Sequence, residues 1–301
     1  MTEVHGADPR GSITELARAK VNLTLRILGR RADGYHALES LVAFADIGDE
    51  VRLDLDAAPS VSMSGPYADA IFGPNLVETA LQRLARAEPR LRLGAVTIEK
   101  NLPVAAGLGG GSADAAAVLR AVRRANVDVG ADVDWAGIAA GLGADVPVCL
   151  LNQTAMMWGI GEKLNAIGSI PELPAVLVTP DAPVPADKTR QVFSQLEAGP
   201  VPDELGGDPA LLPSFSNLDE LVSFLRERGN DLAVPARKVV PAIEEAEALL
   251  AACRNCLLVR VSGAGPTCYG VFPHTVAAAA AAKELERSRP RWWIRAVTLG
   301  G

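Results

Sequence analysis

The chain has 301 residues, of which 49% are hydrophobic and 22% charged, and 29 basic against 36 acidic residues give a formal charge of −7. This length is enough for two domains, and the composition predicts a packed core and excludes an intrinsically disordered chain. The acidic balance argues against a general nucleic-acid or membrane-surface binder. The sequence has no apolar run of the roughly 20 residues that a membrane helix needs and no signal-peptide core. We therefore expect a cytoplasmic protein.

The first regular pattern follows a loose polar tail at residues 1–10 and alternates from residue 13 to residue 28. Aliphatic side chains occupy every second position there, which predicts a half-buried strand with Lys20, Asn22 and Thr24 on its other face. Two interpretations of that polar face stay open, because it would suit contact with water as well as contact with a ligand.

A turn-rich segment over residues 29–36 separates this strand from further extended segments at 41–44 and 51–55. The segment ends in Tyr35 and His36. A loop aromatic beside a titratable histidine can be surface packing, or it can hold a flat ligand. Both interpretations stay open at this stage.

Asn75 is predicted to cap a helix over residues 76–87, and Glu78 has the position of a capping-box acid. The alternative role of Asn75 is a ligand contact. A short strand at 95–100 then leads into the most distinctive part of the chain.

The stretch from Pro103 to Leu119 holds glycines at positions 107, 109, 110 and 111, followed by Ser112 and a run of strong helix formers. Glycine admits positive φ and the close approach of another group. Ser112 is a suitable N-cap, with Asp114 in the first turn. A glycine loop that opens a helix favours phosphate, because free N–H groups and the positive end of the helix dipole meet there. A helix entry of small residues without a ligand is the alternative.

The spacing of this loop fits neither of the two commonest phosphate loops. A Walker A loop needs a lysine where Ser112 stands. A dinucleotide fingerprint needs a third glycine at that place and a strand directly before the loop, but residues 103–106 intervene. The stretch alone therefore predicts phosphate binding and nothing finer.

A second tight turn carries Asp145. A helix predicted over 135–141 ends at glycines, and Pro147 is expected to prevent it from resuming. Asp145 is then either a local turn or cap ligand, or an acid presented to a substrate. Residues 149–158 are expected to be extended.

The second half of the chain alternates strands with helices, after a linker at 171–174 that predicts domains 1–170 and 171–301. Strands are expected at 175–178, 257–261, 267–272 and 293–297, and helices at 189–196, 218–227, 235–253 and 276–286. Residues 262–266 form a second glycine turn well placed to face a ligand. The Pro- and Gly-rich residues 199–213 are expected to form a mobile loop.

The four cysteines are expected to be ordinary reduced thiols. Cys253 and Cys256 are the only close pair. A zinc site wants four ligands, and the three histidines offer no matching second pair. No protein metal site is therefore predicted.

Several of these segments together resemble one superfamily. The pattern P-x-x-x-G-L-G-G-G-S-x-D-A-A from Pro103 is similar to the phosphate loop of the galactokinase, homoserine kinase, mevalonate kinase and phosphomevalonate kinase superfamily, with Ala113 where many members have a second serine. The motifs A-K-V-N-L at 19–23, G-Y-H at 34–36 and G-A-D-V-P at 143–147 resemble one branch, the 4-diphosphocytidyl-2-C-methyl-D-erythritol kinases. The likeness runs from about residue 17 to about residue 272, with Pro266 where many relatives have alanine.

The resemblance implies direct phosphoryl transfer from ATP to an alcohol. Asp145 would accept the hydroxyl proton, and Lys20 would keep that carboxylate ionised and stabilise the developing oxyanion. Mg²⁺ would be carried in on ATP, since no acidic metal cage is evident. The implied nucleotide-binding residues are Pro103, Val104, Ala105, Ala106, Gly107, Leu108, Gly109, Gly110, Gly111, Ser112 and Ala113, with Asn75 and Lys100 as adenosine contacts.

The substrate that this branch implies is 4-diphosphocytidyl-2-C-methyl-D-erythritol, phosphorylated on its 2-hydroxyl in the non-mevalonate isoprenoid pathway. Tyr35 and Phe193 would sandwich the cytosine, and His36 would bind its edge. The implied substrate-binding residues are Asn22, Tyr35, His36, Phe193, Gly263 and Gly265. Two alternatives remain: a kinase of the same superfamily acting on homoserine or mevalonate-type substrates, and a non-catalytic nucleotide-binding protein on this scaffold.

The implied fold is α+β in two domains, an N-terminal ATP-binding domain and a smaller C-terminal domain of split βαβ type, with the active site in the cleft between them. We expect a monomer or weak homodimer that binds a small molecule and neither nucleic acid nor membrane.

Overall fold

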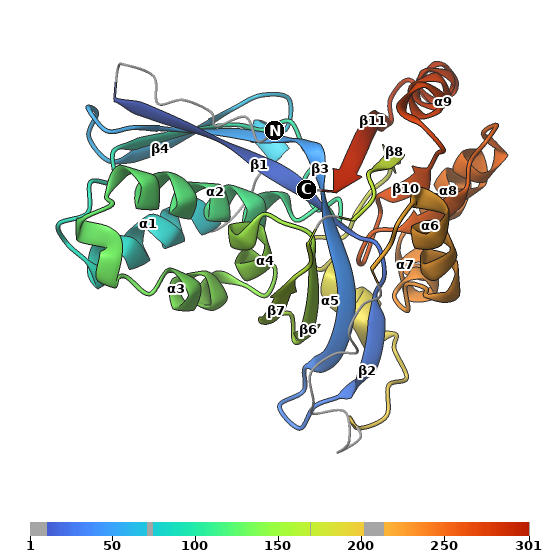
Figure 1. Cartoon of the computed structure of the whole chain (residues 1–301), viewed down its shortest axis with the longest axis horizontal. Helices are drawn as coiled ribbons and strands as arrows, with labels where there is room; N and C mark the ends of the chain where they lie inside the picture. The colour runs from blue at the N-terminus through green and yellow to red at the C-terminus, as the bar shows by residue number, and fades with distance from the viewer. Residues whose placement is uncertain (1–10, 71–74, 169, 202–213, 301) are drawn as a thin grey trace. The chain divides into compact units, whose positions relative to one another are not determined.

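The computed structural model describes residues 11–70, 75–168, 170–201 and 214–300, and the chain forms two compact units (Figure 1). The first unit comprises Met1–Ala19, Ile47–Val104 and Gly109–Asn152, and the second comprises Lys20–Asp46, Ala105–Leu108 and Gln153–Gly301. Strands β1 (Ser12–Asn22) and β3 (His36–Asp54) therefore contribute residues to both units. The glycine stretch does the same.

The strands of the first unit surround the second half of β3. Strand β5 (Ala95–Glu99) pairs antiparallel with β3 and parallel with β4 (Ser60–Ser64), and β1 also pairs with β3. The two extended segments predicted at 41–44 and 51–55 are one continuous strand. Gly48 lets the strand continue without a break because glycine has no Cβ. A Cβ at this position would collide with the carbonyl of Ala17 on β1.

Four helices of the first unit, α1 to α4, pack against one another (Figure 1). They are α1 (Leu76–Ala87), α2 (Gly110–Ala125), α3 (Trp135–Leu142) and α4 (Val146–Leu151), with short 3₁₀ turns at Ala68–Ala70 and Val129–Asp132. The predicted cap of α1 is confirmed, since Asn75 Oδ1 accepts from Val77 N at 2.9 Å. Asparagine at this place satisfies one N–H that the first turn leaves free.

Two predictions about helix starts are wrong. Helix α2 begins at Gly110 with Gly109 as its N-cap at φ 68°, so Ser112 lies inside the helix rather than capping it. Pro147 does not prevent a helix either, because it lies in the first turn of α4, where the missing N–H has no intrahelical partner to lose. The predicted extended segment at 149–158 therefore begins only at β6 (Ala155–Gly159).

The sheet of the second unit is antiparallel and runs in the order β3–β11–β8–β10–β9. Besides β3, its strands are β8 (Leu173–Thr179), β9 (Leu258–Val261), β10 (Cys268–Val271) and β11 (Trp293–Gly300). Strands β2 (Arg26–Arg30) and β6 pair with the first half of β3. Strand β7 (Lys163–Ala166) pairs with β6. Helices separate β8 from β9 and β10 from β11. This is the predicted split βαβ arrangement, and the α+β class is confirmed.

The helices of the second unit cover this sheet with small and branched side chains. They are α5 (Lys188–Ser194), α6 (Leu218–Glu227), α7 (Ala233–Val239), α8 (Ala242–Ala252) and α9 (Thr275–Ser288). Ile243 and Leu250 of α8 are fully buried in one core with Val176 of β8. The single helix predicted at 235–253 is two helices, because Pro241 ends the first and starts the second.

Two further features of the sequence bear on the fold. Most of the predicted mobile loop at 199–213 lies outside the described residues. Among the described helices, none is both long and apolar enough to cross a lipid bilayer.

Candidate active site

The polar face of β1 is buried in the second unit. Lys20 and Asn22 are only 4% and 2% exposed. The Lys20 ammonium donates to Asn22 Oδ1 at 3.0 Å, and Asn22 Nδ2 donates to Ser40 Oγ at 2.7 Å. Buried polar groups are stable only when they are hydrogen-bonded. The structure therefore decides the question that the alternating pattern left open, because this face does not contact water.

Backbone hydrogen bonds join the same strand to the glycine stretch. Lys20 N donates to Leu108 O at 2.8 Å, which fixes the lysine beside residues 105–108. Ser262 Oγ donates to Gly107 O at 3.1 Å, and Thr267 N donates to Ala106 O at 3.0 Å. The second unit thus brings one end of the phosphate loop, the catalytic lysine predicted from the sequence and the second glycine turn into contact.

The glycines of these two turns are required by the close approach of the backbones. Gly107 has φ +82°, and a Cβ on it would lie 2.6 Å from Gly265 O and 2.8 Å from Ser262 O. A Cβ on Gly263 would lie 3.0 Å from Asn22 Oδ1. Asn230 Nδ2 holds the second turn by donating to Val261 O and Gly263 O, both at 2.8 Å.

The predicted cytosine-binding residues come from three elements: Tyr35 from the loop before β3, His36 from the first position of β3, and Phe193 from α5. The rings of His36 and Phe193 lie 5.4 Å apart between centroids, tilted by 37°, so these two predicted residues are neighbours. Tyr35 is 61% exposed. Burial and the charge of Arg30 lower the pKa of His36, which favours a neutral imidazole with one donor and one acceptor nitrogen.

The other half of the phosphate loop lies in the first unit, where it opens α2. The first intrahelical bond there runs from Ala113 N to Gly109 O at 2.8 Å. The N–H groups of Gly110, Gly111 and Ser112 precede it and so have no acceptor within the helix. Together with the helix dipole, they form the kind of site that binds a phosphate.

Asp145 is the residue directly before α4. It is half-buried with φ −88° and ψ −13°, and its side chain makes no capping hydrogen bond to the helix. Asp145 therefore does not cap α4 with its side chain, and the choice between a turn ligand and an acid presented to a substrate stays a prediction. Asp145 belongs to the first unit and Lys20 to the second, so their pairing stays a prediction.

Lys100 is 3% exposed, and its ammonium pairs with Asp49 and, at 2.5 Å, with Asp114. Asp49 Oδ1 also accepts from the backbone N–H groups of Asn101 and Leu102 at 2.6 and 2.8 Å. This triad fixes the segment between β5 and the glycine loop. The predicted adenosine contact of Lys100 stays a prediction, because its ammonium is engaged with two carboxylates. Asp114 is a buried partner rather than the expected first-turn acid.

The charges in this triad do not balance. Burial raises the pKa of Asp114 to about 7, against the lowering effect of Lys100 and with a further contribution from the Asp49 charge. Asp114 Oδ1 is buried and has no hydrogen-bond partner among the described residues. One ammonium facing two carboxylates leaves an excess negative charge, so Asp114 retains a proton close to neutral pH.

Several residues that shape these sites could not be found from sequence patterns. Ser40 and Ser262 complete the hydrogen bonds around Asn22, and Asp49 completes the ion pairs of Lys100. The partner of Asn22 N lies 240 residues away along the chain. Only tertiary structure reveals such pairs.

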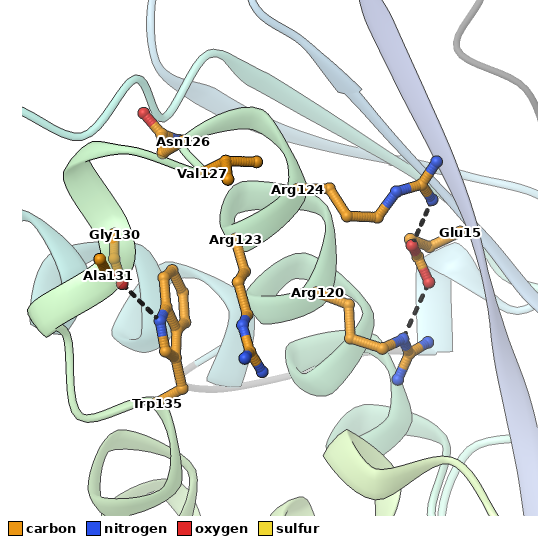
Figure 2. Close-up of a pocket in the computed structure, with 9 residues that line it drawn as sticks. All are labelled: Glu15, Arg120, Arg123, Arg124, Asn126, Val127, Gly130, Ala131 and Trp135. Atoms are coloured by element: carbon orange, nitrogen blue, oxygen red, sulfur yellow. Dashed lines mark hydrogen bonds and ion pairs between the residues drawn. The ribbon is translucent and has the colours of Figure 1, made fainter.

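Figure 2 shows a pocket in the first unit that none of the predicted site residues lines. Arg120 and Arg124 of α2 both reach Glu15 on β1, at 2.8 and 2.7 Å (Figure 2). On the other side of the pocket, the Trp135 indole donates to Gly130 O at 3.0 Å. The two arginine pairs hold α2 against β1, and the indole bond ties the start of α3 to the 3₁₀ turn at Val129–Asp132, so both have a structural role.

The cysteines carry no evident chemistry. All four are free thiols, and burial raises the pKa of Cys256 to about 11, which keeps it protonated. In the described part of the chain, no three His, Cys, Asp or Glu residues gather in a way that would hold a metal ion.

The fold and the glycine loop define a class of small-molecule kinases. A family model for the GHMP kinases N terminal domain matches residues 75–153, and one for the GHMP kinases C terminal domain matches residues 210–290. A homoserine kinase from Cytophaga hutchinsonii shares the fold with a TM-score of 0.65 at 16% identity, over 99% of this chain and 97% of that one.

Proteins with higher sequence identity to this chain define its family within this class of kinases. A 4-diphosphocytidyl-2-C-methyl-D-erythritol kinase from Parvibaculum lavamentivorans is 44% identical over 97% of this chain and 99% of its own, and one from Rhodopseudomonas palustris is 44% identical over 99% and 100%. A crystal structure of 4-(cytidine 5'-diphospho)-2C-methyl-D-erythritol kinase has a TM-score of 0.73 at 33% identity, over 96% of this chain and 100% of that one. The chain belongs to this family, the 4-diphosphocytidyl-2-C-methyl-D-erythritol kinases, and the resemblance found in its motifs is confirmed.

Proposed function

We propose that the protein transfers the γ-phosphoryl group of ATP to the 2-hydroxyl of 4-diphosphocytidyl-2-C-methyl-D-erythritol. The observation that carries this proposal is the buried Lys20, which is tied by its backbone to the glycine stretch and by its ammonium to Asn22. A cation fixed at one end of a phosphate loop suits a reaction in which negative charge must be positioned and stabilised. Relatives named 4-diphosphocytidyl-2-C-methyl-D-erythritol kinase match nearly the whole chain and support the same substrate.

The reaction divides among a few groups of this chain. Asp145 accepts the proton of the attacking hydroxyl, and Lys20 stabilises the charge that develops on that oxygen. The N–H groups at the start of α2 hold the phosphates of ATP. Mg²⁺ enters bound to ATP, and Ser112 in the first turn of α2 is the hydroxyl suited to reach phosphate or metal.

Recognition of the substrate's cytidine end falls to Tyr35 in the loop before β3, His36 at the start of β3 and Phe193 on α5. Tyr35 stacks on one face of the cytosine and Phe193 on the other, while a neutral His36 binds its edge. The exposure of Tyr35 supports this role, because an exposed aromatic can cover a flat ring without displacing any packing. Gly263 and Gly265 complete the substrate site next to Asn22.

The remaining assignments follow the same scheme. Residues 1–170 hold the nucleotide, with Asn75 and Lys100 near the adenosine, and residues 171–301 complete the substrate site. The separate family models for residues 75–153 and 210–290 support a division into two parts somewhere between those ranges. We place the enzyme in the cytoplasm as a monomer or weak homodimer.

A substrate panel tests the proposal. ADP release is measured with ATP, Mg²⁺ and each of four alcohols: the cytidylated alcohol, 2-C-methyl-D-erythritol 4-phosphate, homoserine and mevalonate. Turnover of the cytidylated alcohol should exceed that of the others by a large factor, and phosphorus NMR should show a new monoester on its 2-hydroxyl. Equal use of the first two alcohols would show that the cytidine is not recognised.

A further inference from the structure

Lys188, the first residue of α5, is a buried cation that the scheme above does not use. Its side chain is 4% exposed. Its ammonium donates to Ala105 O at 2.9 Å and also to Gly265 O. Ala105 begins the part of the phosphate loop that belongs to the second unit, and Gly265 lies in the second glycine turn. The head group of Lys188 therefore joins the two turns that surround Lys20.

The charge of Lys188 has no counter-ion in the described part of the chain. Its hydrogen-bond acceptors there are both neutral carbonyls, and the charge that acts on it is that of Lys20. Burial, followed by the repulsion of Lys20, lowers the pKa of Lys188 to about 8. Buried charges in proteins are normally paired. The ammonium groups of Lys20 and Lys188 thus lie in one interior, and among the described residues no carboxylate pairs with Lys188. This arrangement indicates a site prepared for an anion.

The position of the ammonium also leaves one donor for a ligand. A lysine head group has three N–H donors, and Lys188 uses two of them on Ala105 O and Gly265 O. Ala105 has φ +56°, which is unfavourable for a residue with a Cβ. Such a conformation persists only where its surroundings hold it, and it is common at functional sites. The bond from Lys188 is one contact that holds it.

We propose that Lys188 is a second phosphate-binding cation of the active site, which uses its third N–H to hold a phosphate oxygen of a bound substrate beside Lys20. This inference rests on the proposed function, since it takes Lys20 to lie at the site of phosphoryl transfer. The oxygen belongs either to the γ-phosphate of ATP or to the diphosphate of the alcohol substrate. Both present the same anionic chemistry, and kinetics separates them.

The test compares Lys188→Met with Lys238→Met. The first variant removes the buried charge and keeps the volume, and the second removes an exposed charge on α7 as a matched control. Lys188→Met should lose at least tenfold in kcat/KM, equivalent to about 1.4 kcal/mol, and Lys238→Met should match the parent. A higher KM for ATP or a lower kcat assigns the γ-phosphate, whereas a higher KM for the alcohol alone assigns its diphosphate. Kinetic constants within threefold of the parent in a folded Lys188→Met would overturn the proposal.

Lys188→Arg keeps the test decisive if the methionine variant does not fold. Arginine stays charged at every pH used, and the pH profile of kcat/KM reports groups of the free enzyme. The parent should lose kcat/KM above about pH 8, where Lys188 gives up its proton. Lys188→Arg should retain activity to higher pH. A lysine that only braces the two turns would leave the alkaline limbs of parent and variant identical, and that result overturns the proposal.

The parent enzyme separates failure of this inference from failure of the proposed function. If the parent does not phosphorylate the cytidylated alcohol, the proposed substrate is wrong. The ratio of variant to parent can then be measured with whichever alcohol the parent does use. Only that ratio tests Lys188.

Discussion

Replacement of Gly107 by alanine should destabilise the protein and weaken ATP binding together. The new Cβ would lie 2.6 Å from Gly265 O and 2.8 Å from Ser262 O, whereas ordinary contacts begin at 3.4 Å. One of the two turns must therefore shift by several tenths of an ångström. Overpacking of this kind costs about 1–3 kcal/mol, in addition to about 1–2 kcal/mol for an alanine at positive φ.

Gly34→Ala is the matched control for the backbone term. Gly34 has φ +88°, close to the +82° of Gly107, but a Cβ there would meet no atom within 4 Å. Its substitution should cost only the backbone term, which in both variants is reduced by about 0.4–1 kcal/mol because alanine restricts the unfolded chain. The difference between the two variants should therefore be about 1–3 kcal/mol, from the overpacking alone.

Urea unfolding followed by tryptophan fluorescence measures this difference, and titration calorimetry measures the Kd for ATP. We expect Gly107→Ala to raise the Kd about tenfold or more, equivalent to about 1.4 kcal/mol, because residues 105–108 move with the displaced turn. Gly34→Ala should leave the Kd unchanged. If the two variants had the same stability and the same Kd, the contact between the glycine turns would have no energetic role and the reasoning would be refuted.

Three further substitutions test other parts of the site. Asp145→Asn should lower kcat by about 10²–10⁴-fold, as loss of a general base does, and should leave the Kd for ATP unchanged. The control variant Asp134→Asn, at the neighbouring helix cap, should have no effect. A rate near that of the parent in Asp145→Asn would make Asp145 structural. Tyr35→Ala should raise the KM for the cytidylated alcohol roughly tenfold, because stacking on a base contributes about 1–3 kcal/mol, while an altered KM for ATP alone would speak against stacking. The pKa of Asp114 is raised from 3.8 to about 7, so its stabilising contribution is complete below pH 4 and is lost as the pH rises through 7. Unfolding in urea between pH 5 and 8 should show this decline in the parent and a flatter profile in Asp114→Asn, and parallel profiles would contradict the assignment.

Local chemistry made parts of this structure predictable from sequence. Asn75 caps α1 as expected, because an amide oxygen before a helix satisfies a neighbouring N–H whatever the rest of the fold does. The glycine stretch opens a helix for a similarly local reason, since glycine adopts the positive φ of positions 107 and 109 without strain. The motifs at 19–23, 34–36 and 143–147 were enough to indicate the family.

Sequence reasoning failed where two local signals competed. Ser112 and Gly109 both suit a helix start, and the chain uses Gly109 because its left-handed conformation turns the loop into α2. Pro147 was expected to exclude a helix, yet a proline in the first turn loses no hydrogen bond. The choice depends on where the neighbouring elements place the chain, which a short window of sequence does not contain.

The environment of each charge was decided by tertiary structure alone. Alternation placed Lys20 and Asn22 on one face of a strand but left open whether that face contacts water; the fold buries it against Ser40 and Ser262. In the sequence, nothing distinguishes Lys188 from any other lysine near a helix start. Its two hydrogen-bond acceptors lie 83 and 77 residues away along the chain. Hydrogen-bonding capacity and backbone freedom belong to single residues and are visible in a sequence. Burial and electrostatic potential are sums over distant neighbours, so they exist only after the chain has folded.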